Sequence, residues 1–478
     1  MKTLIQNGTI VTAGETFEGD VLIDGEIIAA IGRDLPRDGA EVIDARGKHV
    51  LPGGIDVHVH LALPFGGTVS SDDFYTGHRA AAFGGTTTAI DFAMQAVGGT
   101  LSQALDTWHA KSDDKACIDF GYHAGITDLT DHVMEEIAEL PRHGVASIKL
   151  FMAYKGVFQV DDATLFRAME RARDVGLLTM VHAENGDAID ILVRQAIEAG
   201  NLEPRYHALT RPAELEGEAT GRAVAMAEVL DAPLYIVHLT NEHSLVRVQE
   251  ARMRGSRVHA ETCVQYLFFT KDDLARPDFE GAKWVCTPPF RTQKDRELLW
   301  NALRDDDLSI VSTDHCPFFF ETQKTLGRER FDKIPNGIPA IEERLKVLHE
   351  FGVNRNRFDL NRFVALTSTN PAKLFGLEGR KGSIAPGYDA DIAIWDMNRE
   401  QTISAAGSHS NVDYNLWEGT RVRGVPQQVF VRGRLIVDGD RFLGEAGYGR
   451  YLHRSCRAPG RTAKARPAAE SPLAALQA

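Results

Sequence analysis

The chain has 478 residues, of which 43% are hydrophobic and 25% are charged, a balance typical of globular proteins. This length exceeds that of a typical single domain, so we expect one large domain and a smaller partner. The net charge of -14 argues against a nucleic-acid partner, because phosphate binding requires a clustered basic surface.

The first segment, MKTLIQNGTIVTAG, lacks the basic start and the long apolar run of a secretory signal. No apolar run reaches the roughly 20 residues needed to span a bilayer. The five cysteines are scattered without CxxC spacing, a distribution typical of reduced thiols. We therefore expect a cytoplasmic protein that has no membrane partner.

Both ends of the chain have the sequence pattern of short β-strands. In residues 1–52, Asn-Gly and Asp-Gly turn signals separate β-rich runs, and another Asp-Gly pair lies within residues 376–446. We predict that these two segments form one β-sandwich. Residues 447–478 are rich in Ala, Pro and Arg, and we expect an extended arm or a disordered tail there.

The middle segment, residues 53–375, alternates apolar β-branched runs with stretches of helical periodicity such as ATLFRAMERARDVG. The eight predicted strands are IDVHVH, TTTAIDF, IDFGYHAGI, ASIKLF, LLTMVH, LYIVH, VHAETCV and SIVSTDH. Eight such units favour a (β/α)₈ barrel. A doubly wound sheet is the alternative, but no Gly-rich phosphate fingerprint follows the first strand. We predict a TIM-like barrel.

Polar side chains stand at or near the carboxyl ends of separate predicted strands, where barrel enzymes place catalytic groups. His58 and His60 are two residues apart, so their imidazoles share one face of a strand. A lone buried histidine is more often a core residue than a ligand, and we assign His123 and His259 to that class. The candidate metal ligands are His58, His60, Lys149, His182, His238 and Asp314.

Lys149 lies inside the predicted strand ASIKLF. Burial lowers the pKa of a lysine, and the neutral amine reacts with carbon dioxide to give a carbamate. This anion offers two oxygens and can bridge two metals. The alternative is a lysine that extends to solvent, but the position of Lys149 among the other ligands favours the carbamylated lysine.

The resulting ligand set predicts two divalent metal ions. One ion is expected to bind His58, His60, Asp314 and one carbamate oxygen, and the other is expected to bind His182, His238 and the second oxygen. Imidazole nitrogens and carboxylate-like oxygens suit Zn²⁺. Two such ions lower the pKa of a shared water and polarise a substrate carbonyl.

The motifs GGIDVHVH, SIKLFMAYKG, VHAENGD, TDHCPF and KIPNGIPAIEER occur in this order. Together they resemble the dihydropyrimidinase and D-hydantoinase branch of the cyclic amidohydrolases, over nearly the whole chain. The resemblance implies a barrel with a side β-sandwich, a binuclear zinc site, a cytoplasmic location and a homotetramer. It also implies hydrolysis of small cyclic amides, such as dihydrouracil and 5-substituted hydantoins, to N-carbamoyl amino acids.

The same resemblance implies roles for single residues. Lys149 matches the carbamylated position, and Tyr154 matches the tyrosine whose hydroxyl stabilises the oxyanion. Asn336 matches a residue that reads the ring amide through its backbone. Thr287 stands where relatives usually have serine, and we expect its backbone contacts to survive that change. In this mechanism Asp314 accepts the proton of the attacking water and returns it to the leaving nitrogen.

The residues around the metal ligands predict the substrate preference. An apolar lid without a charged group should accept alkyl or aryl rings and reject carboxylates; its expected members are Leu61, Leu63, Phe65, Phe151 and Phe158. Dihydroorotase relatives carry an arginine just after the HxH motif, whereas leucine and alanine follow it here. Allantoinase is another enzyme alternative. A non-catalytic scaffold like the collapsin-response mediator proteins is disfavoured, because all six candidate ligands are present.

Overall fold

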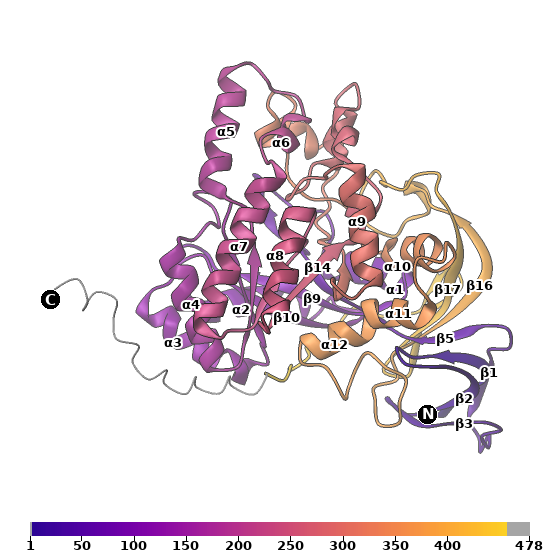
Figure 1. Ribbon diagram of the computed structural model, residues 1–478. Coiled ribbons are helices and arrows are strands. Elements are labelled where there is room, and N and C mark those ends of the chain that lie inside the picture. The colour runs from indigo at the N-terminus through magenta and orange to yellow at the C-terminus, as the bar shows by residue number, and fades with distance from the viewer. Residues whose placement is uncertain (1, 457–478) are drawn as a thin grey trace.

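The computed structural model describes residues 2–456 and has two parts (Figure 1). The larger part is a parallel eight-stranded sheet with the order β15-β14-β13-β12-β11-β10-β9-β6. Its strands are β6 (Gly54–Val59), β9 (Thr86–Met94), β10 (Asp119–Gly125), β11 (Ser147–Phe151), β12 (Leu178–His182), β13 (Leu234–Ile236), β14 (Val258–Cys263) and β15 (Ile310–Ser312). Consecutive strands in the sequence are therefore neighbours in space.

The sheet closes on itself. A parallel bridge between Val59 and His315 joins the first strand to the segment after the last one. A doubly wound sheet would have two open edges and a reversal of strand order, whereas this sheet shows sequential order and closure. The predicted (β/α)₈ barrel is confirmed.

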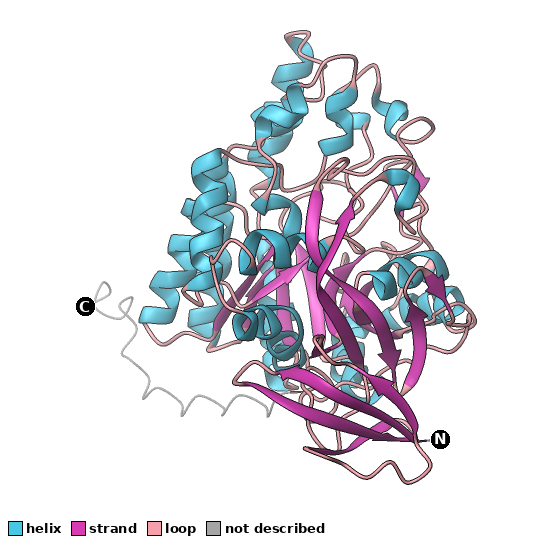
Figure 2. Ribbon diagram, turned by 90° about the vertical axis from the view of Figure 1, so that its right-hand side faces the viewer, coloured by secondary structure: helices cyan, strands magenta, loops and turns pink. Residues whose placement is uncertain are grey.

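Helices surround the barrel (Figure 2). They are α1 (Phe74–Phe83), α2 (Leu101–Ser112), α3 (Asp131–Glu139), α4 (Asp162–Asp174), α5 (Gly186–Glu198), α6 (Tyr206–Leu209), α7 (Ala213–Leu230), α8 (Glu242–Met253), α9 (Gln293–Arg304), α10 (Arg344–Leu348), α11 (Leu360–Val364) and α12 (Asn370–Leu374). Helix α4 illustrates why these segments are helical and pack on the barrel. Asp161 caps its first turn, and its buried residues recur at helical spacing: Leu165, Ala168, Met169 and Ala172.

The smaller part is a nine-stranded sheet built from both ends of the chain. Its strands are β1 (Lys2–Val11), β2 (Thr16–Asp24), β3 (Ile27–Gly32), β4 (Glu41–Asp44), β5 (His49–Pro52), β16 (Ile392–Thr402), β17 (Arg421–Val431), β18 (Arg434–Asp438) and β19 (Arg441–Phe442). Strands β5 and β16 pair antiparallel and join the two ends, as Figure 1 shows at the right. The sheet covers an aliphatic core of its own, so the predicted second domain is confirmed.

The segment after β19 lies on the barrel. Phe120 in β10 donates its N–H to the carbonyl of Arg450 at 3.0 Å, and Leu452 donates back to Phe120 at 2.7 Å. Leu452 and Arg454 are buried. Residues 447–456 of the predicted arm are thus extended and packed, while 457–478 lie outside the described residues. None of the helices within residues 2–456 has the length and apolarity to cross a bilayer.

Candidate active site

The parallel barrel brings the candidate ligands to one end, because the carboxyl ends of its strands point the same way. His58 lies in β6, Lys149 in β11, and His182 is the last residue of β12. His60, His238 and Asp314 follow β6, β13 and β15 by one or two residues. The structure therefore places all six at the carboxyl-terminal mouth of the barrel.

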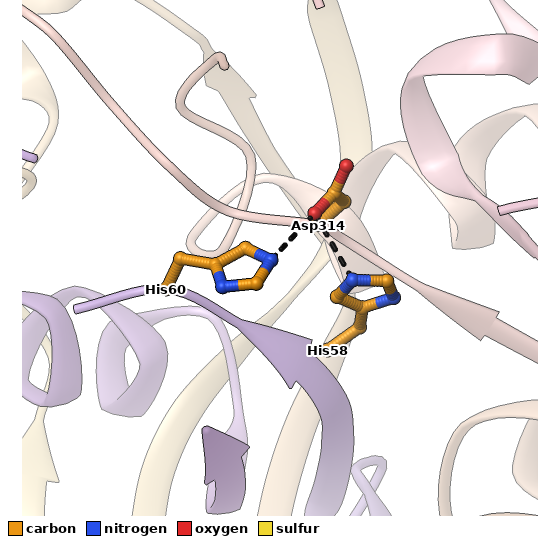
Figure 3. A group of neighbouring side chains, drawn as sticks. All are labelled: His58, His60 and Asp314. Carbon is orange, nitrogen blue, oxygen red and sulfur yellow. Dashed lines mark ion pairs between the residues drawn. The ribbon is translucent and has the colours of Figure 1, made fainter. Parts of the chain in front are cut away.

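The first group is His58, His60 and Asp314, whose side chains converge in Figure 3. Nε2 of each histidine lies 3.1 Å from Oδ1 of Asp314. The donor atoms of these three residues all lie within 4.8 Å of one another, close enough for one metal ion. Although burial alone would raise the pKa of Asp314, His58 and His60 hold it well below its usual value.

The orientation of His58 tests whether a cation fits there. Nδ1 of His58 lies 2.6 Å from Oε1 of Glu261, so Nδ1 carries a proton and donates it. In a neutral ring, the lone pair on Nε2 would then face the Asp314 oxygen, and two electron-rich atoms at 3.1 Å need a cation between them. Burial lowers the pKa of His58, but Asp314 and Glu261 outweigh it and raise the pKa to about 9. A proton or a metal ion satisfies this arrangement.

The second group is His182 and His238. Nδ1 of His182 lies 2.9 Å from Nε2 of His238, while Nε2 of His182 lies 2.8 Å from Oε2 of Glu184. Burial lowers the pKa of His182 and lowers that of His238 much further, so both rings are neutral. Since Glu184 takes the Nε2–H of His182, the Nδ1 lone pair is directed toward His238. This pair can offer two nitrogens to one metal ion.

Lys149 lies between the two groups along the barrel and is only 1% exposed. Its Nζ is 5.1 Å from the ring centre of Phe92 and 4.9 Å from that of Phe151. Burial lowers the pKa of Lys149 to about 7, against the opposing effect of Asp314 and Glu261. A substantial fraction of this amine is thus unprotonated and nucleophilic at neutral pH.

Three of the site residues have left-handed backbone conformations, which residues with a side chain rarely adopt. The φ angle is 69° at Tyr154, 38° at His238 and 51° at Asp314. Each lies just after a barrel strand, where the chain turns sharply and aims the side chain into the mouth. Such strain clusters at functional sites, and it marks the same end of the barrel as the ligands do.

A cavity opens beside the first metal-ligand group. Its lining combines two candidate ligands, an aromatic wall and residues of two loops: His60, Leu63, Phe65, Met94, Phe151, Tyr154, Phe158, Thr287, Asp314, Cys316, Asn336 and Gly337. No lysine or arginine of the described residues belongs to this lining. The predicted positions Thr287 and Asn336 thus face the same cavity as the ligands.

Comparison with known proteins agrees with this geometry. Residues 49–436 match the Amidohydrolase family. D-hydantoinase of Geobacillus stearothermophilus is 51% identical over 95% of this chain and 97% of its own length. Dihydropyrimidinase of Rattus norvegicus is 40% identical over 95% and 89%, respectively. The crystal structure of dihydropyrimidinase from Brevibacillus agri NCHU1002 superposes with a TM-score of 0.95 at 51% identity, covering 96% of this chain and all of that one.

The chain belongs to the amidohydrolase family. Within it, the chain is a member of the dihydropyrimidinase and D-hydantoinase group, as the motifs indicated.

The aromatic wall of this amidohydrolase is a packed cluster. The ring of Phe65 lies 5.7 Å from that of Phe158 and 5.5 Å from that of Tyr154, and Phe151 lies 5.2 Å from Phe158. Phe65 belongs to a short hairpin, β7 (Pro64–Phe65) and β8 (Thr68–Val69). The hairpin and the loop after β11 therefore form one wall of the cavity.

Leu61 lies elsewhere. It is fully buried, its side chain faces Gly77 in α1, and it is not among the residues that line the cavity. Its backbone N–H donates to Oδ2 of Asp91 at 2.7 Å, and the following residue, Ala62, has a φ of 49°. Leu61 is next to His60 and so points to the opposite face, into the core, whereas Leu63, which follows the turn at Ala62, reaches the cavity.

The amidohydrolase site also uses residues that sequence reasoning did not select. Glu261 in β14 accepts hydrogen bonds from His58 and, at 2.9 Å, from the hydroxyl of Tyr235. Glu184 orients His182 in the same way. The available signal was a carboxylate inside a buried apolar strand, VHAETC, and a second one two residues after His182. His123, by contrast, lies in the core, bonded to the carbonyl of Val57 at 2.9 Å.

Proposed function

We propose that this amidohydrolase opens cyclic diamide rings, 5,6-dihydropyrimidines and 5-substituted hydantoins, to N-carbamoyl amino acids. One observation carries the proposal: six potential metal ligands meet at the barrel mouth beside a cavity with an aromatic wall, and no lysine or arginine of the described residues belongs to its lining. Its relatives named D-hydantoinase and dihydropyrimidinase support the same reaction.

Two divalent metal ions, which we expect to be Zn²⁺, would bind in this site. His58, His60 and Asp314 would hold one ion, and His182 and His238 the other. Imidazole and carboxylate donors of this kind suit zinc. When bound, such a pair of ions supplies an activated water and polarises the carbonyl under attack.

Lys149 would bridge the two ions as a carbamate. Its neutral amine adds to the carbon of carbon dioxide, the new N–C bond forms, and the nitrogen loses one proton to solvent. The product is an anion with two oxygens. The lowered pKa of Lys149, about 7, keeps enough free amine for this step, and carbamylation removes a cation from a site that must hold two others.

Asp314 and Tyr154 would perform the proton transfer and the oxyanion stabilisation. The Asp314 carboxylate accepts the proton of the attacking water and delivers it to the ring nitrogen as the C–N bond breaks. Tyr154 shares the cavity with Asp314. Burial raises the pKa of the Tyr154 hydroxyl, so the hydroxyl stays protonated and can donate a hydrogen bond to the oxyanion.

The ring amide would bind to the backbone at Thr287 and Asn336, which line the same cavity as the aromatic wall. The substituent at the chiral carbon would then pack against Leu63, Phe65 and Phe158, which stabilises alkyl and aryl groups by roughly 25 cal/mol for each Å² of apolar surface that is buried. A wall on one side of that carbon favours one enantiomer, and we propose the D form. We further propose that the enzyme is a cytoplasmic homotetramer.

Turnover of three substrates tests the function. The purified enzyme should open dihydrouracil and 5-phenylhydantoin with a kcat/KM at least ten times that for dihydroorotate, because the cavity offers no cation to a carboxylate. Zinc content near two ions per subunit should accompany this activity. A higher kcat/KM for dihydroorotate or allantoin than for dihydrouracil and 5-phenylhydantoin would show that the proposed substrate class is wrong.

A further inference from the structure

A second fully buried lysine lies behind the cavity wall. Lys324, the first residue of the 3₁₀ helix η5 (Lys324–Gly327), has 0% of its surface exposed. Its Nζ donates to three backbone carbonyls: Val285 at 2.9 Å, Pro335 at 2.8 Å and Gly337 at 2.7 Å. These three bonds use all three protons of an ammonium group.

The three carbonyls belong to the two loops that contribute Thr287 and Asn336 to the cavity lining. Val285 lies two residues before Thr287, and Pro335 and Gly337 flank Asn336 on either side. The loops also bond to each other, since the N–H of Gly337 donates to the carbonyl of Val285 at 3.0 Å. One ammonium and one backbone hydrogen bond therefore join the two loops that contribute Thr287 and Asn336 to the cavity lining.

The contact also changes the chemistry of one peptide group. The carbonyl of Pro335 and the N–H of Asn336 belong to the same peptide bond. A positive charge on the carbonyl oxygen draws electron density from that peptide, which makes its N–H a stronger donor. Within residues 2–456 no acceptor is bonded to the Asn336 N–H, so this donor is free for a ring carbonyl.

We propose that Lys324 is a positioning residue for substrate binding, which holds the Thr287 and Asn336 loops at the separation that a cyclic amide ring requires. The proposal rests on the ring-opening function above. Lys324 itself does not reach the cavity, because its ammonium is enclosed by the three carbonyls and the ring of Phe318, 5.8 Å away. It thus acts through the loops and not on the substrate.

The buried charge is consistent with a dedicated role. Burial lowers the pKa of Lys324 to about 7, and no carboxylate of the described residues forms an ion pair with it. A methionine at this position would fill a similar volume without a desolvation cost. The lysine differs from methionine in its three hydrogen bonds, and all three go to the loops that contain Thr287 and Asn336.

Two variants and a control test the proposal. Lys324→Met removes all three donors, and Lys324→Gln keeps part of them. The control is Lys346→Met, which removes another buried lysine. Lys346 lies in α10, and its Nζ donates to Oε1 of Glu342 at 3.0 Å. For each protein we would measure metal content, melting temperature, and kcat and KM with unsubstituted hydantoin and 5-phenylhydantoin.

We expect Lys324→Met to keep its metal and to lose roughly 10- to 100-fold in kcat/KM, mostly through KM, since buried carbonyls are left unpaired and the loops shift. The loss should be equal for both substrates, because both contain the ring. Lys324→Gln should lie between Lys324→Met and the wild type, and Lys346→Met should match the wild type within about two-fold.

A folded Lys324→Met enzyme with normal metal and kcat/KM within two-fold of wild type would overturn the proposal. So would a loss confined to 5-phenylhydantoin, which would place Lys324 in the substituent pocket instead. If the methionine variant does not fold, an unchanged KM in Lys324→Gln is equally decisive. A wild-type enzyme that opens neither ring would refute the proposed function and not this inference.

Discussion

Lys149 and Lys324 both lie near the cavity, behind residues of its lining, and begin from the same physical condition. Both are almost fully buried, and burial lowers the pKa of each to about 7. Their partners differ. Lys149 faces the rings of Phe92 and Phe151, whereas Lys324 donates to three carbonyls. Burial makes a lysine able to lose its proton, and the neighbours decide whether the amine reacts or remains a donor.

A third buried lysine shows the opposite balance. Lys381 lies between the barrel and the smaller domain, with its Nζ 2.6 Å from Asp119 and 2.7 Å from Asp391. Burial acts to lower the pKa of Lys381, but these carboxylates outweigh it and raise that pKa above its ordinary value. This lysine stays charged and joins the two domains. Of the three, Lys149 and Lys324 have a pKa that burial lowers to about 7, and Lys149 is the one that is not held by three carbonyl acceptors.

Substitution of Lys149 should cause the largest loss of activity. It should also remove the metal, whereas Lys324→Met should keep it. Lys149→Ala should lose most of its metal and several orders of magnitude of activity, because no bridging anion remains. Added acetate or propionate should restore part of both, whereas Lys149→Arg should not respond, since guanidinium stays charged. Metal analysis with and without the added acid measures this. Normal metal content in Lys149→Ala would show that no carbamate bridges the site.

Asp314→Asn should come next. The amide can still contact a cation through its oxygen but cannot accept the proton of the attacking water, so we expect kcat to fall roughly 10³-fold or more. Steady-state kinetics on enzyme whose metal content has been verified measures the loss. An asparagine variant with full metal and near-normal kcat would remove Asp314 from the proton transfer and leave it as a ligand only.

Tyr154→Phe tests the proposed oxyanion donor in the aromatic wall of the cavity. Loss of one oxyanion donor typically costs about 10²- to 10³-fold in kcat, and metal content should stay normal. The comparison with Lys324→Met is then direct, because that variant should change mainly KM. If Tyr154→Phe also changes only KM, the tyrosine binds the substrate and does not stabilise the transition state.

Glu261→Gln should have the smallest effect. The amide can still accept from Nδ1 of His58 but carries no charge, so we expect metal affinity to fall roughly 10- to 100-fold, with near-normal activity when metal is in excess. Titration with a chelator measures the affinity. A variant with unchanged metal affinity would indicate that Glu261 serves the packing of β14 and Tyr235 alone.

The sequence allowed the barrel and the clustering of the candidate ligands at its mouth to be predicted because both follow from simple periodicity. Buried strands recur at regular intervals, and each ligand ends one of them, so the parallel topology alone brings His182 and His238 together. Residues beyond the strands are harder. Leu61 follows His60 directly and therefore lies on the opposite face, in the core. The left-handed turn at Ala62 then places Leu63 in the cavity lining, which alternation alone does not predict.

Lys324 could not be predicted for a different reason. It lies in a polar stretch, TQKTLGRER, where a lysine is expected to be solvated, and its partners are backbone carbonyls that have no signature in the sequence. Glu261 is an intermediate case, since a carboxylate within a buried strand requires a partner, but the identity of that partner depends on the closed barrel. Residues that act through backbone groups emerge only from the structure.

The segment 447–456 has a consequence for the synthesis of the protein. Strand β10 is made early, but it bonds to Arg450 and Leu452, and β5 waits for β16 in the same way. In a nascent chain, the start of β10 and strand β5 therefore lack these partners until the end of the described chain has been made. Domains usually fold as units during synthesis, but here the amino-terminal half depends on the last described residues. Cleavage or early termination before residue 447 would leave the N–H and the carbonyl of Phe120 without these partners.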